Sequence, residues 1–115
     1  MNYIDLETNA KRAAVLLKSM ANERRLVILC TLAQGERSVG ELEGVVGLSQ
    51  SALSQHLARL RQDGLVSTRR SAQTIFYSLK GGDAEAVMQA LHRLYCGPEG
   101  GGRIPNQDAI AAERS

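Results

Sequence analysis

Ser49-Gln50-Ser51-Ala52-Leu53-Ser54-Gln55-His56-Leu57-Ala58-Arg59-Leu60 is the stretch that decides the fold. Its three leucines fall at positions i, i+4 and i+7, which is the spacing of one apolar face of a helix. The opposite face carries Gln, Ser and Arg side chains and no carboxylate. Such a face meets phosphates and base edges without repulsion, since Gln pairs with adenine, Arg with guanine and Ser with either.

The residues before this stretch predict a shorter helix and a tight turn. Ser38 and Glu41 have the S-x-x-E spacing of a capping box, which marks a helix start. Gly47 stands where a left-handed residue would end that helix, and Ser49 is a suitable N-cap for the next one. Two short helices joined by a glycine turn are typical of a helix-turn-helix.

The residues after it predict a basic β-hairpin. Asp63-Gly64 ends the helix, and residues 65–70 and 74–79 are rich in β-forming side chains joined by Ser71-Ala72-Gln73. A polar helix face or an arginine pair is, taken alone, usually just solvated. In this order the features indicate a mainly α fold with a β-hairpin wing, the winged helix-turn-helix.

Ten side chains are candidates for contact with double-stranded operator DNA. Those at the start of the second helix are expected at base edges, the arginines on phosphates or in the minor groove, and Gln73 at the wing tip. For His56 the sequence leaves open a phosphate or a neighbouring helix. The candidates are Ser49, Gln50, Ser51, Ser54, Gln55, His56, Arg59, Arg69, Arg70 and Gln73.

Composition and charge fit one small domain. The chain has 115 residues, 43% of them hydrophobic, and a net charge of +2. Residues 56–70 hold four Arg and one Asp, a local charge of +3 with His neutral, which suits DNA binding with phosphate contacts. No apolar run reaches membrane-spanning length and no secretory signal opens the chain, so we expect a cytoplasmic protein without membrane contact.

Three more helices are predicted outside the reading head, as we call the two helices of the helix-turn-helix together with the turn between them. They cover residues 7–20, the residues between Asn22, a suitable N-cap, and Gly35, which ends the helix, and the residues from the cap Asp83 to about Cys96. The first and last remain apolar after the winged helix has used its core, so we expect them to form the interface of a homodimer. The domain is therefore predicted to span residues 1–96, and the glycine-rich residues 97–115 to be a mobile tail.

The two cysteines, Cys30 and Cys96, are open to three interpretations. They are inert core residues, metal ligands or a redox pair. A structural disulfide is not expected in a cytosolic chain. Because the helix around Cys30 is apolar on nearly every side, the simplest expectation for that residue alone is a small buried hydrophobe.

Four segments together resemble the ArsR/SmtB family. They are residues 22–29, residues 53–66, Arg69-Arg70 and residues 76–79. The resemblance covers roughly residues 8–96. It implies a winged helix dimerising through its first and last helices, and a repressor that leaves its operator when an inducer acts.

Within that family the chain resembles the BigR/SqrR/HlyU branch, at residues 29–32, 38–42, 73–77 and 94–96. This implies that Cys30 and Cys96 form a dithiol sensor of persulfides or polysulfides. Cross-linking by a disulfide or a longer sulfur bridge would lower DNA affinity. The metal-sensing members are matched less well, because residues 38–44 lack cysteine and the last helix offers only Asp83 and His92. No metal or cofactor is expected.

Other functions have specific signatures to meet. A metal- or metalloid-responsive repressor would use Cys30, Cys96 and His92, and a general thiol-oxidation sensor would use the same cysteines. An enzyme is not expected, because the chain has no C-x-x-C, no nucleotide-binding loop and no supported Ser-His-Asp set. A protein-interaction module without DNA binding would not need the carboxylate-free helix face.

Overall fold

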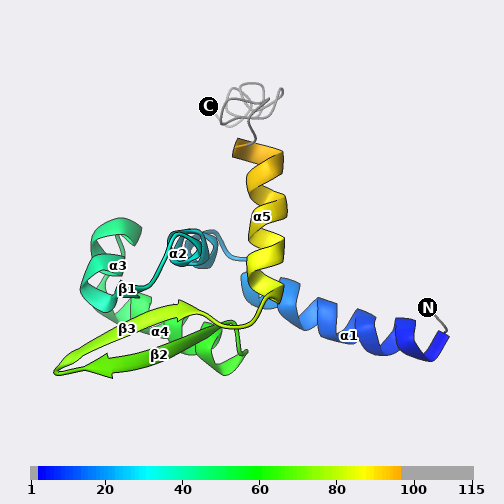
Figure 1. Cartoon of the computed structure of the whole chain (residues 1–115), viewed down its shortest axis with the longest axis horizontal. Coiled ribbons are helices and arrows are strands. Elements are labelled where there is room, and N and C mark those ends of the chain that lie inside the picture. The colour runs from blue at the N-terminus through cyan, green and yellow to red at the C-terminus, as the bar shows by residue number, and fades with distance from the viewer. Residues whose placement is uncertain (1–2, 97–115) are drawn as a thin grey trace. The chain divides into compact units, whose positions relative to one another are not determined.

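The structure, a computed structural model, describes residues 3–96. Five helices and three strands lie in this range, and they confirm the winged helix-turn-helix (Figure 1). The chain divides into two compact units, residues 1–85 and 86–115, which we describe separately. The predicted tail, residues 97–115, lies outside the described residues. The elements are α1 Tyr3–Met20, α2 Glu23–Ala33, β1 Arg37–Ser38, α3 Val39–Val46, α4 Gln50–Gln62, β2 Val66–Ser71, β3 Thr74–Leu79 and α5 Asp83–Cys96.

The predicted helix starts are confirmed by their hydrogen bonds. Asn22 Oδ1 accepts from the backbone N–H groups of Arg24 and Arg25 at the start of α2. Ser38 and Glu41 form the capping box of α3, with both reciprocal bonds present. These side chains satisfy donors that the first helical turn leaves without a backbone partner.

The turn between α3 and α4 has the predicted left-handed glycine. Gly47 has φ 73° and ψ 25°, and its N–H donates to the carbonyl of Glu43. Two residues later, Ser49 Oγ accepts from the N–H of Ala52 and starts α4. The two helices of the reading head are therefore joined by only three residues.

The core of the first unit lies between α2, α3, α4 and the hairpin. The apolar face of α4 is fully buried, as predicted from its leucine spacing, and α4 packs against α1, α2, α3 and β2. Each such side chain contributes roughly 1.5–3 kcal/mol on burial. The core side chains are Ile28, Leu29, Leu32, Leu42, Val46, Leu53, Leu57, Leu60, Leu65 and Val66.

The wing is part of a three-stranded antiparallel sheet of order β1-β3-β2. The sequence did not predict β1, whose Ser38 pairs with Phe76 of β3. The expected three-residue connection at 71–73 is wrong, because Ser71 pairs with Thr74 and only two residues form the turn. Ala72 in that turn has φ 56°, a conformation that favours glycine.

Two outer helices complete the described chain. Helix α1 begins four residues before the predicted start at residue 7, and it leaves Leu6, Val15 and Leu17 more than half exposed. Helix α5, considered by itself, exposes Leu94 and Tyr95. Within residues 3–96, neither of these helices nor any other has the length and apolar character needed to cross a membrane.

Candidate nucleic-acid interface

The outer face of α4 is polar and open to solvent. Gln50, Ser51, Ser54 and Gln55 are exposed, and none of these side chains is bonded to another residue within the described range. Helix α4 contains no Asp or Glu. The leucines on its inner face hold the helix, so these donors and acceptors are free to bind a ligand.

Two further candidates on α4 are held by other side chains. Arg59 Nε donates to the Asp63 carboxylate at 2.7 Å, an i,i+4 ion pair at the end of the helix. His56 is half-buried, and its Nδ1 lies 3.3 Å from the guanidinium of Arg25 on α2. His56 thus contacts a neighbouring helix, as the sequence allowed, and its contact with DNA stays a prediction.

The electrostatics around His56 favour its neutral form. Burial, and then the positive charges of Arg25 and Arg24, hold the pKa of His56 below its ordinary value. Neutral Nδ1 accepts the Arg25 hydrogen bond, whereas a protonated ring would place a cation beside a cation. Since Arg25 Nε also donates to the carbonyl of Ser19 at 2.6 Å, this arginine links α1, α2 and α4.

The wing presents one free arginine and one arginine in an ion pair. Arg70 and Gln73 are exposed and have no side-chain partner among the described residues. Arg69 instead donates two hydrogen bonds to the Glu36 carboxylate, both 2.8 Å, and lies over the Phe76 ring. Glu36 was missed from the sequence, because the 33 positions that separate it from Arg69 leave no local signal.

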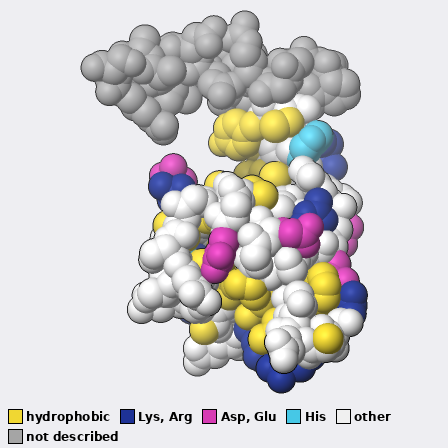
Figure 2. All heavy atoms as spheres, turned by 90° about the vertical axis from the view of Figure 1, so that its left-hand side faces the viewer, with side chains coloured by type: hydrophobic (Ala, Val, Ile, Leu, Met, Phe, Trp, Pro, Cys, Tyr) yellow, Lys and Arg dark blue, Asp and Glu magenta, His cyan; other side chains and the backbone are white. Residues whose placement is uncertain are grey.

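Several basic side chains lie together along one edge in Figure 2. Figure 2 views the side that faces left in Figure 1, where α3 and the tip of the hairpin lie, and it shows Lys and Arg side chains along the lower edge. A basic edge attached to a near-neutral chain attracts a polyanion locally. Arg61 at the end of α4 and Arg70 on the wing are both exposed.

Both thiols are free and exposed. For Cys30 this contradicts the expectation of a small buried hydrophobe. Helix α2 turns Ile28, Leu29 and Leu32 into the core, which leaves Cys30 on its outer side. Cys96 is the last residue of α5. Among residues 3–96, no group of three or more His, Cys, Asp or Glu side chains is placed to hold a metal ion.

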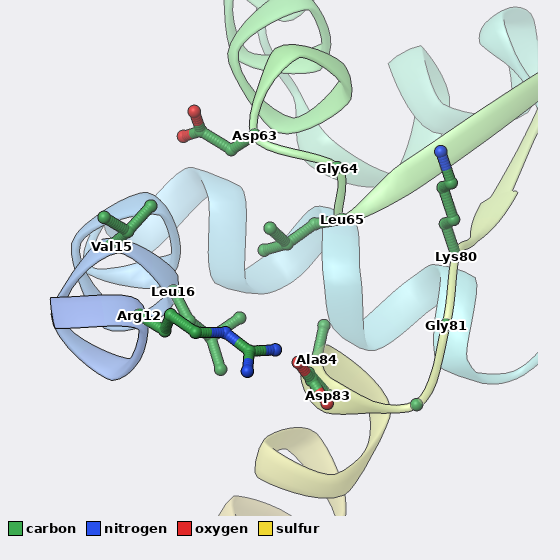
Figure 3. A pocket seen from close by; sticks show the side chains of 11 residues that line it. Arg12, Val15, Leu16, Asp63, Gly64, Leu65, Lys80, Gly81, Asp83 and Ala84 are labelled. Carbon is green, nitrogen blue, oxygen red and sulfur yellow. The ribbon is translucent and has the colours of Figure 1, made fainter. Parts of the chain in front are cut away.

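A pocket of about 470 Å³ lies between α1, the turn after α4 and the segment from β3 to α5. Figure 3 shows Arg12 extending from α1 toward Asp83 and Ala84. Two cations, Arg12 and Lys80, and two carboxylates, Asp63 and Asp83, line it together with apolar side chains. Its charges balance, so neither an anion nor a cation is favoured and we assign no ligand to it.

The capped α3, the left-handed turn, the donor-rich α4 and the hairpin define the class, a winged helix-turn-helix protein. Residues 22–68 match the bacterial regulatory proteins of the arsR family. The transcriptional activator HlyU of Vibrio cholerae is 60% identical over 96 residues, 84% of this chain and 89% of HlyU. The biofilm growth-associated repressor of Agrobacterium fabrum is 48% identical over 94 residues, 82% of this chain and 80% of that protein.

Solved structures agree with this assignment. Reduced HlyU from Vibrio cholerae superposes with a TM-score of 0.77 at 61% identity, covering 80% of this chain and 97% of the HlyU chain. The homodimeric winged helix-turn-helix DNA-binding domain of Mb0332 from Mycobacterium bovis superposes with a TM-score of 0.67 at 32% identity. The match covers 75% of this chain and 80% of the Mb0332 chain. The chain belongs to the ArsR family of bacterial regulatory proteins, in the branch that includes HlyU and BigR.

Proposed function

We propose that this protein is a homodimeric transcriptional repressor that binds operator DNA in its reduced form and is released when Cys30 and Cys96 are cross-linked by persulfide. The observation that carries the DNA-binding part is the exposed, carboxylate-free face of α4. The relatives support regulation of transcription, since one is named an activator and another a repressor. Such a regulator acts in the cytoplasm, where the DNA is.

The proposed contacts divide into base readout and phosphate contact. Gln50, Ser51, Ser54 and Gln55 would read base edges in the major groove, because they are the exposed donors and acceptors of α4. Arg70 and Gln73 on the wing would reach the neighbouring backbone or minor groove. Ser49 caps α4, and Arg59 and His56 have partners in the protein, so these three would contribute mainly by orienting the helix.

We propose α1 and α5 as the dimer interface. The support is the exposed apolar side chains on each of these helices, Leu6, Val15 and Leu17 on α1 and Leu94 and Tyr95 on α5. Large exposed apolar side chains that lie on one side of a helix, as Leu6 and Leu17 do on α1, mark a surface for association. A two-fold dimer would present two copies of α4 to the two half-sites of an operator.

The proposed switch is a sulfur transfer followed by a displacement. One protein thiol takes the outer sulfur of a persulfide R–S–SH, which leaves R–SH and a cysteine persulfide. The second thiol attacks the inner sulfur, forms the disulfide, and the outer sulfur departs with the thiol proton as hydrogen sulfide. If the first cysteine has already taken a second sulfur, the same displacement leaves a three-sulfur bridge. Exposure of both thiols supports their access to the reagent.

The contacts of α2 support coupling to DNA. Cys30 lies on α2, and the same helix contacts α4 through Arg25 and His56. A bridge that displaces α2 would therefore disturb the placement of the reading helix. A coupling free energy of about 1–3 kcal/mol changes affinity by roughly 5–150-fold.

DNA binding is tested first with the reduced protein and duplexes that it selects from a random library. Fluorescence anisotropy over a range of salt concentrations should give a log–log slope of about −0.9 for each phosphate contacted. Gln55→Ala should weaken binding to the selected duplex more than to an unrelated one. Affinity that is weak and independent of salt and of sequence would overturn the proposal.

The thiol switch is tested by mass spectrometry and by release from DNA. Trypsin separates Cys30, in the peptide of residues 26–37, from Cys96, in the peptide of residues 94–103. A low-molecular-weight persulfide should link them, and Cys30→Ser and Cys96→Ser should each bind the duplex but no longer leave it. Linkage by peroxide and disulfide as well would indicate a general thiol-oxidation sensor, and normal release of either variant would exclude the pair.

A further inference from the structure

Phe76 of β3 is the middle one of three residues that pair across the whole sheet. On one side it pairs with Ser38 of β1, and on the other with Arg69 of β2. Residues directly opposite each other in antiparallel strands have their side chains on the same face of the sheet. Ser38, Phe76 and Arg69 therefore share one face, and Ser38 is also the N-cap of α3.

Glu36 is linked to these paired residues through Arg69. Its carboxylate receives both Arg69 hydrogen bonds at 2.8 Å, while the Arg69 guanidinium carbon lies 4.5 Å from the centre of the Phe76 ring. Two parallel N–H···O bonds fix direction as well as distance, and an aromatic face beneath the guanidinium holds its plane. The hydrogen bonds from Arg69 also hold the pKa of the Glu36 carboxyl below its ordinary value.

Arg70 faces the other way. Successive side chains of a strand point to opposite faces, so Arg70 and its partner Ile75 lie on the face away from Arg69. Arg69 has its charge paired and its plane stacked, whereas Arg70 has neither kind of contact with the described residues. The two adjacent arginines of the wing are thus in different environments, and nothing in the neighbouring sequence distinguishes them.

We infer that Glu36, Arg69 and Phe76 form a clamp that sets the position of the wing relative to α3, and that Arg69 is a positioning residue through which Arg70 is presented to DNA. The inference rests on the proposed function. It assigns Arg69, a candidate for direct DNA contact, to a role inside the protein.

Removing the negative charge of Glu36 distinguishes the two possible roles of Arg69, because they predict opposite changes in DNA affinity. If Arg69 bound a phosphate, Glu36→Gln would free it and remove a repelling charge, so binding would tighten. With the clamp, Glu36→Gln releases the wing and weakens binding of the selected duplex by about fivefold, the upper range for an exposed ion pair. Glu43→Gln is the matched control, because it removes the same charge from a side chain without a bonded partner in the described range, and its effect should stay within about twofold.

The exchanged pair is the second test. Glu36→Arg combined with Arg69→Glu keeps the net charge and allows the ion pair to form in reverse. The clamp predicts that this double variant binds within about twofold of the unaltered protein, while Arg69→Glu alone binds far more weakly. Equal loss in the double variant and in Arg69→Glu alone would overturn the inference, because it would show that position 69 needs a cation facing DNA.

Hydrogen exchange of the free protein separates the clamp from the proposed function. Glu36→Gln should speed exchange of the amides of β2 and β3, with no such change in Glu43→Gln. Unchanged protection of the hairpin would refute the clamp whatever the protein binds. Absence of duplex binding by the unaltered protein, with faster exchange in Glu36→Gln, would refute the proposed function and leave the clamp supported.

Discussion

Gly47 and Gly44 offer a paired test of the helix-turn-helix, because alanine should have opposite effects at the two positions. Gly47 ends α3 with φ 73° and ψ 25°, while Gly44 lies inside α3. A Cβ added at either glycine meets nothing within 4 Å. No steric clash therefore enters the comparison, and only the backbone conformation separates the two substitutions.

The magnitudes follow from that conformation. An L-residue in the left-handed region destabilises the folded state by about 1–2 kcal/mol. Alanine also restricts the unfolded chain more than glycine does, which offsets about 0.4–1 kcal/mol of that loss. Gly47→Ala should therefore lower the free energy of unfolding by roughly 1 kcal/mol. Gly44→Ala should raise it by about 0.5–1 kcal/mol, because alanine is the better helix former. Gly47→Asn should fall between Gly47→Ala and the unaltered protein, since asparagine tolerates this conformation.

The assay is urea and thermal denaturation of the reduced protein, with all variants at one concentration because a dimer unfolds with a concentration-dependent midpoint. For a domain of this size, 1 kcal/mol corresponds to a change in Tm of about 4–8 °C. The two alanine variants should thus differ by roughly 6–16 °C. Equal stability of Gly47→Ala and Gly44→Ala would refute the left-handed turn that joins α3 to α4.

Three further predictions concern pH, assembly and the wing. The pKa of His56 in the folded protein is below its ordinary value of 6.5, so the unfolded chain takes up the proton first as the pH falls. The free energy of unfolding should therefore decrease as the pH drops below 6.5. In urea denaturation at a series of pH values, His56→Asn should make this decrease smaller. Leu17→Glu should convert a dimer into a monomer in analytical ultracentrifugation, and a variant that stays dimeric would contradict the proposed interface. Ala72→Gly should raise stability by about 1 kcal/mol, because φ 56° strains alanine; a lower Tm would exclude this turn.

Local signals account for what the sequence predicted well. The capping box of Ser38 and Glu41, the cap at Asn22 and the left-handed Gly47 each depend on residues within a few positions of one another. The leucine spacing of α4 predicted its buried face correctly, because a regular helix converts sequence period directly into orientation. Fold class and reading head were therefore predictable from the chain alone.

Features that depend on distant residues were not predictable. The strand β1 has two residues, too few to show an alternating pattern, and it forms because β3 lies beside it. Arg69 was grouped with Arg70 since nothing near it in the sequence indicates Glu36. The exposure of Cys30 was missed for a related reason, because a helix that is apolar all round does not indicate which side faces the core.

The outward side chains of α4 have a consequence for how regulators of this kind diversify. Gln50, Ser51, Ser54 and Gln55 are not bonded to other side chains within residues 3–96, while the buried leucines, the Ser49 cap and the side-chain contacts of His56 and Arg59 hold the helix. Exchanging an outward residue should therefore change which base pairs are preferred at almost no cost in folding free energy. With the base readout proposed above, operator preference would evolve by single substitutions, and the same four positions would form a suitable library for selecting regulators of chosen promoters.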